Sequence, residues 1–190
     1  MVSVRAYTPK MEKAWVRAYN RISLSRKDIL FLLQNKPADL LYRDQLVLID
    51  EQDQIIGFCD TAADKNILTV VHFGILPDHF PTASTAIDAI IHRFSSSDFE
   101  RLIIMSGDTR HTNLFREKGF TVRRNIVRFF CNAPRSLLSD TKTDNLFCDH
   151  VYAECPANKW KQVRSSLTII ESDLMYPVTY QELILEKAGR

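Results

Sequence analysis

Apolar residues recur at two different periods along this chain, and the two periods predict helices and strands in alternation. In residues 10–22 and 86–94 they return every three or four positions, as on the buried side of a helix. Other runs are rich in β-branched and aromatic residues, which are typical of strands: 2–7, 46–50, 55–62, 67–76, 101–107 and 121–132. This order predicts a mixed α/β sheet with helices on both sides.

Capping and turn residues mark the ends of several predicted elements. Thr8 followed by Pro9 is typical of a helix start, and Gly119 is typical of the position just after a helix. Ser25 is suited to cap a second helix, which Pro37 would help to end. The polar tetrad EQDQ separates two apolar runs and indicates a hairpin turn.

The stretch GILPDHFPTASTAIDAIIHRF, residues 74–94, predicts the end of a strand, a turn and then a helix. A helix N-terminus carries unpaired N–H groups and a partial positive charge, so such a junction is suited to bind phosphate. Phosphate-binding turns usually contain glycines, which let the backbone approach the anion closely. No glycine lies between Leu76 and Thr85, so a phosphate site here would be built without them.

The texture of the sequence changes after Asn132, which divides the chain into residues 1–131 and a C-terminal extension of residues 132–190. An extension of this length forms little core of its own, so we expect it to pack on the same domain. Two roles stay open for it: it covers a sheet edge or a cleft of the main domain, or it forms a contact in a homodimer.

Within the extension, the first residues are polar and turn-prone, and residues 146–155 predict one strand. Asn158 is suited to cap a helix over residues 159–172. Thr179 and Glu182 have the spacing of a capping box, which predicts a last short helix.

Composition and charge argue against several classes of partner. The chain has 25 basic and 23 acidic residues, and this balance argues against binding to nucleic acid or to an anionic membrane. Arg123, Arg124 and Arg128 favour a solvated strand face over a nucleic-acid patch. No apolar run approaches the roughly 20 residues of a membrane span, and the N-terminus lacks the apolar core of a secretory signal.

Four cysteines are too few for a disulfide scaffold in a chain of 190 residues, which favours free thiols and a cytoplasmic location. Cys148, His150 and Cys155 lie close together in the sequence and raise the alternative of a metal site. Their spacing matches no common zinc pattern and no second cluster completes four ligands, so we expect no metal.

Two motifs stand at a spacing that carries a family resemblance. The segment DTRHTNLFREKGF is similar to the pattern N-x-x-A-x-x-L-Y-x-K-x-G-F, with Asp108 at the Asn position and Gly119-Phe120 at its end. ILP, residues 75–77, looks like the hydrophobic-x-Pro that leads into a pyrophosphate loop. Over about residues 2–131 the chain resembles the GNAT acyltransferase superfamily as a divergent member. The resemblance implies a mixed, mostly antiparallel central sheet flanked by helices, followed here by a C-terminal strand and helix extension.

The resemblance also implies that acetyl-CoA is the co-substrate and lies where the fourth and fifth strands of the sheet separate. Backbone groups at Ile75 and Leu76 would bond its pantetheine arm. Further cofactor-binding candidates are His79, Phe80, Thr82, Ala83, Ser84, Thr85 and Asp108. In this family the acetyl group moves directly to an amine, so the expected partner is a primary amine of a small molecule or peptide.

Three departures from the family pattern favour an alternative, a GNAT-fold binding or regulatory protein without catalysis. The pyrophosphate loop lacks its glycines and its arginine or glutamine, and Pro81 supplies no N–H. Phe115 stands where a tyrosine often protonates the leaving thiolate. Asp108 puts a negative charge where a neutral amide is usual.

Two histidines are the catalytic candidates. His72 lies on the strand expected to line the cleft and could deprotonate an ammonium, since histidine titrates near neutral pH; the alternative is a strand histidine with a satisfied ring. His111 could protonate the thiolate in place of the missing tyrosine, or it is a surface helix histidine. Near the hairpin ends, Asp60, Asp64 and Glu51 either bind a cationic acceptor or are exposed turn residues.

Overall fold

The computed structural model describes residues 2–25, 42–132, 142–147, 150–166, 168–169 and 177–187. Most of the helix predicted over residues 25–37 lies outside this part of the chain, as does most of the polar segment that follows Asn132.

The chain begins with a strand and a helix, as predicted. After β1 (Ser3–Ala6), Thr8 is extended, with φ −130° and ψ 152°, and Pro9 opens the short 3-10 helix η1 (Pro9–Met11). This helix leads into α1 (Glu12–Ser25). Proline suits the first helical position because its φ is already helical and the N–H that it lacks would have no partner there.

The middle of the chain follows the predicted order closely. Its elements are β2 (Tyr42–Ile49), β3 (Ile55–Asp64), β4 (Ile67–Ile75), the 3-10 helix η2 (Pro77–Thr82), α3 (Ala83–Ser95), β5 (Arg101–Ser106), α4 (Thr109–Glu117) and β6 (Thr121–Asn132). Gly119 follows α4 with φ 92°, a left-handed conformation that glycine adopts without strain.

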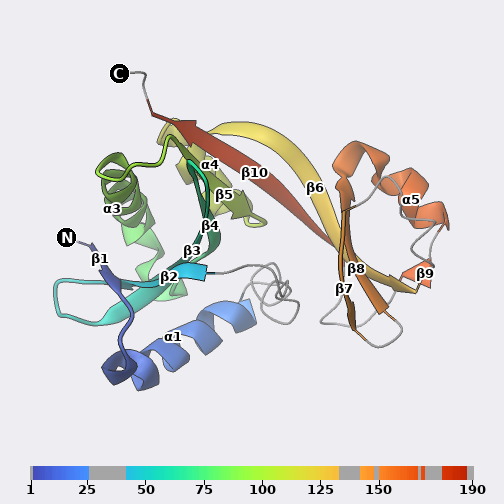
Figure 1. Ribbon diagram of the computed structural model, residues 1–190. Helices are drawn as coiled ribbons and strands as arrows, with labels where there is room; N and C mark the ends of the chain where they lie inside the picture. The colour runs from blue at the N-terminus through green and yellow to red at the C-terminus, as the bar shows by residue number, and fades with distance from the viewer. Residues whose placement is uncertain are drawn as a thin grey trace.

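The C-terminal residues contribute β7 (Lys142–Phe147), β8 (His150–Pro156), β9 (Thr168–Ile169) and β10 (Val178–Glu186). In the described part of the chain, ten strands form one sheet in the order β1-β2-β3-β4-β5-β10-β6-β8-β7, with β9 beside β6 (Figure 1). The β4–β5 pair is parallel and the other pairs are antiparallel. The sheet is therefore mixed and mostly antiparallel, as predicted.

The short helix predicted from Thr179 is wrong, because this segment is strand β10. β10 pairs with β5 on one side and β6 on the other, so it lies inside the sheet. Tyr180 and Leu183 are completely buried. Burial of these side chains between two strands outweighs the local capping signal, which is worth about 1 kcal/mol.

The single strand predicted over residues 146–155 is two strands, β7 and β8. The helix predicted from Asn158 is present but shorter: η4 (Ala157–Lys159) leads into α5 (Trp160–Ser166), and β9 follows. Trp160 packs on Phe129 of β6 with ring centroids 4.9 Å apart. β7, β8, β9 and α5 lie at the far end of β6, away from α1 and α3 (Figure 1).

Side chains of β4 alternate between two cores on opposite faces of the sheet. Phe73 and Ile75 belong to the larger core, which includes buried residues of α3 and α4. Leu76 lies in a smaller core with Ile22 of α1 and Phe58 of β3. The C-terminal end of β4 therefore lies between α1 on one face and the pair α3 and α4 on the other.

Candidate functional site

The sheet opens at one place, between β4 and β5. The parallel pairing runs from Ile67↔Arg101 to Val70↔Ile104 and stops there, although both strands continue. At the same point the β3–β4 register shifts, from Thr61↔Val70 to Asp60↔His72, which makes Val71 a bulge residue. A bulge bends its strand and increases the local twist. The structure therefore shows a separation of two neighbouring strands, as expected for a ligand cleft.

Backbone groups of β4 face this opening at alternate residues. The Leu76 N–H donates to the Ile56 carbonyl at 2.8 Å, so it points to β3 and is not directed at the opening. Because N–H and C=O groups alternate in direction along a strand, those of Phe73 and Ile75 point toward β5. Of the two predicted backbone contacts, Ile75 is placed to bond a ligand, whereas the Leu76 N–H already has a partner.

The predicted pyrophosphate segment is helical throughout. η2 runs directly into α3, and the Ala83 N–H donates to the Phe80 carbonyl. The Thr82 hydroxyl donates to the His79 carbonyl at 2.7 Å. Pro81 has no N–H to offer. Part of the donor set expected at this helix start is therefore used internally, while Ser84 is half-buried and Thr85 is exposed.

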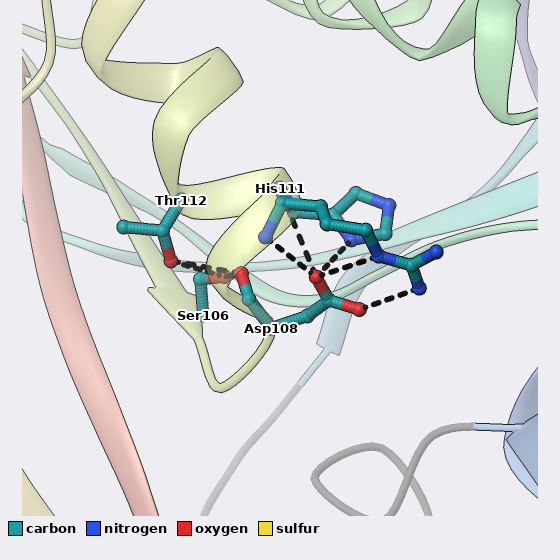
Figure 2. A network of polar contacts seen from close by, with 5 residues as sticks. Ser106, Asp108, His111 and Thr112 are labelled. Atoms are coloured by element: carbon teal, nitrogen blue, oxygen red, sulfur yellow. Dashed lines mark hydrogen bonds and ion pairs between the residues drawn. The ribbon is translucent and has the colours of Figure 1, made fainter.

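At the start of α4, Asp108 is the helix N-cap (Figure 2). Its Oδ1 accepts hydrogen bonds from the backbone N–H groups of Arg110 and His111 at 2.8 and 3.3 Å. The Asp108 carboxylate also pairs with the Arg110 guanidinium at 3.1 Å and raises its pKa above the ordinary value. The Thr112 hydroxyl lies 3.0 Å from both Ser106 Oγ and the Asp108 carbonyl. Asp108 therefore organises the first turn of α4.

Aromatic rings link η2, β4 and α4 beside the opening. The His111 ring contacts Phe73 and Phe80 edge-on, with centroids 5.3 and 5.2 Å apart. The Arg110 guanidinium lies over the Phe80 ring at 4.9 Å. His111 is 1% exposed, so the alternative of a surface helix histidine is wrong. The side chain of Phe80 thus bridges the start of α3 and the start of α4.

His72 forms a buried pair with Asp60 of β3. His72 Nδ1 lies 3.1 Å from Asp60 Oδ2, and the two residues are 3% and 4% exposed. A carboxylate only accepts hydrogen bonds, so this contact favours a proton on Nδ1 and leaves Nε2 as the basic nitrogen. The alternative that Asp60 is an exposed turn residue is wrong, whereas Asp64 and Glu51 are exposed at the strand ends.

The structure does not bring the two catalytic candidates together on one face. His72 and Phe73 are neighbours on β4 and point to opposite faces. His111 contacts Phe73 and therefore lies on the face of α3 and α4, while His72 lies on the face covered by α1. The sequence missed Asp60 as the partner of His72.

Metal-ligand clusters and membrane-spanning helices were also sought. Across the described ranges, no group of three or more His, Cys, Asp and Glu side chains could hold a metal ion. Cys59 and Cys155 are free thiols, and burial raises the pKa of each. Cys148 lies outside the described residues. None of the helices in the described part has the length and apolar character that crossing a bilayer requires.

Comparison with solved structures finds this arrangement in acetyltransferases. The chain is similar to a candidate phosphinothricin N-acetyltransferase, with a TM-score of 0.58 and 12% identity over 100% of both chains. It is similar to the spermidine N-acetyltransferase of Vibrio cholerae in complex with CoA and spermine, with a TM-score of 0.51 and 14% identity over 84% of this chain and 98% of that one. A GNAT-family acetyltransferase of Elizabethkingia anophelis with acetyl-CoA bound gives a TM-score of 0.50 and 11% identity over 97% of each chain. No family model matches the sequence, and no curated protein matches it.

Proposed function

Because the chain has the fold of the GNAT acetyltransferases, we propose that it moves an acetyl group from acetyl-CoA to a primary amine of a small molecule or peptide. The observation that carries this proposal is the separation of β4 and β5 at the Val71 bulge, with the starts of α3 and α4 on one face and α1 on the other. Fold likeness alone does not establish chemistry, so the argument rests on the residues at this separation.

The residues present fit the two ends of acetyl-CoA unequally. The outward-facing backbone groups of Phe73 and Ile75 suit the amides of a pantetheine arm, which would lie beside β4 like an added strand. The pyrophosphate end fits less well, since Ala83 N–H and the Thr82 hydroxyl already donate within the segment. His79, Ser84 and Thr85 remain as candidate phosphate contacts, and binding weaker than in a glycine-rich loop is the consequence.

Acetyl-CoA would supply an acetyl group activated as a thioester. In our proposal, His72 Nε2 accepts a proton from the acceptor ammonium, and Asp60 holds the ring in the tautomer that leaves this nitrogen basic. His111, on the other face, is placed to give a proton to the departing sulfur. A base on one face and an acid on the other match a reaction in which amine and thioester meet at the opening from opposite sides.

The acceptor amine is the partner that the Asp60–His72 pair suits. Asp60 Oδ1 is buried and has no hydrogen-bond donor among the described residues. A buried carboxylate oxygen without a donor is costly, and an ammonium or amine group would supply one. The V. cholerae neighbour is printed as a complex with spermine, which makes polyamines the first acceptors to assay.

A second function is favoured by a specific contact: the Phe80 side chain, held between Arg110 and His111, lies where α3 and α4 begin. If that ring excludes CoA, the chain is a GNAT-fold binding or regulatory protein without catalysis. Compartment and assembly are also part of the proposal: the free thiols Cys59 and Cys155 favour the cytoplasm, and the homodimer expected as one alternative still requires a measurement of mass in solution.

Acetyl transfer from acetyl-CoA to spermine, and to a lysine-containing peptide, tests the proposed reaction through release of free CoA. We expect turnover by the wild type and a loss of roughly 10²- to 10⁴-fold in His72→Asn, because a general base contributes about this much. Asp60→Asn should lose activity less severely, and His92→Asn, at an exposed position on α3, should not. Turnover that survives His72→Asn would contradict the role of His72, and absence of turnover with every amine would favour the second function.

A further inference from the structure

A cavity of about 310 Å³, partly open to solvent, lies between the last turns of α3 and the strands beneath it. Its walls include Leu68 of β4, Cys59 of β3 and the α3 residues Ile90 and Phe94. All four side chains are hydrophobic, and three of them are at most 5% exposed. The cavity is thus a mostly apolar space inside the main core of the sheet.

This cavity is separate from the opening between β4 and β5. The candidate phosphate contacts lie at the start of α3, near Ala83, whereas the cavity is lined by its end, near Arg93. At 1.5 Å per residue the two places are roughly 15 Å apart along the helix. The cavity therefore takes no part in the proposed acetyl transfer.

Arg93 is the one charged residue among those that line the cavity. Burial raises the pKa of the Cys59 thiol most strongly, Asp60 raises it further, and Arg93 acts in the opposite direction. The Arg93 charge is therefore felt at the wall of the cavity. A ligand with an apolar body and one anionic group would match both the walls and this charge.

The carbonyl groups at the end of α3 do not oppose an anion as strongly as at an uncapped helix end. Ser95, Ser96 and Ser97 donate their hydroxyls to the carbonyls of Ile91, His92 and Phe94, at 2.9, 3.1 and 2.6 Å. In addition, the Lys187 ammonium lies 5.2 Å from the Phe94 ring centroid and bonds the Ser97 carbonyl. Positive charge and satisfied carbonyls surround this end of the cavity.

The volume sets the size of the ligand. A dry apolar cavity of about 150 Å³ binds benzene, which has six non-hydrogen atoms. By the same ratio, a cavity of this size accepts a ligand of roughly ten to twelve non-hydrogen atoms. An unfilled apolar space of this kind lowers stability, so a bound ligand should raise it.

We propose that this cavity is a binding site for a small carboxylic acid with an apolar body, held by apolar contacts on β3, β4 and α3 and by the charge of Arg93. Sodium octanoate is a suitable probe, because it has ten non-hydrogen atoms, and 1-octanol is its neutral counterpart of the same chain length. The proposal is independent of acetyl transfer, since binding is measured without acetyl-CoA.

Thermal unfolding and calorimetry of the full chain with each probe test the proposal. Octanoate should raise Tm and bind at least tenfold more tightly than octanol. Arg93→Gln should abolish that preference without loss of folding, because Arg93 is exposed, while Arg164→Gln on α5 should keep it. Ile90→Trp, which fills the cavity, should block both probes. Failure of octanoate to bind at millimolar concentration, or equal binding by wild type and Arg93→Gln, would overturn the proposal.

Discussion

Cys59 illustrates how strongly a single buried residue can respond to pH in this protein. Its thiol is completely buried in β3, and burial followed by the charge of Asp60 raises its pKa far above the ordinary value of 9.0. The folded chain therefore keeps a proton on this sulfur at alkaline pH, while the unfolded chain loses it. Stability is present below the ordinary pKa of the thiol and is lost as the pH rises above it.

Above about pH 9, the Cys59 thiol should lower the free energy of unfolding by about 1.4 kcal/mol per pH unit. Cys59→Ala should remove this part of the slope, whereas Val70→Ala, also fully buried but not titratable, should only shift the curve. Urea unfolding from pH 8 to about pH 10.5 measures both variants. Equal slopes in the wild type and in Cys59→Ala would show that the thiol is not protected.

The Asp60–His72 pair shows where sequence reasoning stops at the scale of single residues. The two strands and their turn are predictable from apolar patterning. The register set at the turn, Asp64↔Ile67, would put Cys59 opposite His72 if the ladder were regular. The bulge at Val71 shifts the register by one residue and brings Asp60 there instead. Nothing in the side-chain pattern of β4 announces this bulge.

At the scale of elements, α4 depends on its N-cap. Asp108 accepts two backbone hydrogen bonds, and its carboxylate also lies 3.5 Å from His111 Nδ1. The departure from the family asparagine is therefore compatible with a structural role, because aspartate and asparagine cap helices about equally well. A negative charge is also favourable at a helix N-terminus.

Asp108→Ala should lower the free energy of unfolding by about 1–2 kcal/mol, since both backbone N–H groups lose their acceptor. Asp108→Asn keeps an acceptor oxygen and should retain most of the stability while losing the ion pair to Arg110. Chemical denaturation of the three proteins compares them directly. If Asn and Ala destabilise equally, the ion pair rather than the cap stabilises this turn.

β10 is the element that local signals misidentify. The spacing of Thr179 and Glu182 matches a helix start, yet Glu182 is buried in a strand and forms ion pairs with Arg123 and Arg124 at 3.0 and 2.8 Å. These contacts join residues almost sixty positions apart in the chain. Sequence windows of a few residues contain the capping pattern but not the partner strands, so tertiary pairing decides the outcome.

At the scale of the whole molecule, the last strand completes the middle of the sheet. β10 separates β5 from β6 and contributes buried Tyr180 and Leu183 to two different clusters. The order of elements up to β6 was predictable from the sequence, whereas the role of the C-terminal residues was not. Residues 132–190 therefore include an interior strand as well as the unit of β7, β8 and α5.

A chain that ends at Pro134 should not fold, because the edges of β5 and β6 would be left without their shared partner. A chain that ends at Lys187, just after β10, should fold like the wild type and serves as the control. Dispersion of amide signals in NMR spectra distinguishes the two outcomes. A soluble, cooperatively unfolding protein ending at Pro134 would show that β10 is dispensable.

Titration of the purified chain with acetyl-CoA and with CoA by calorimetry tests the central claim most directly. The opening at the Val71 bulge offers backbone partners for the pantetheine arm, while the loss of one or two amide contacts at η2 costs about 1–3 kcal/mol each and weakens binding roughly tenfold to hundredfold. We predict measurable binding of both ligands at micromolar to submillimolar concentration. No binding at millimolar concentration would contradict the account and assign the fold to another purpose.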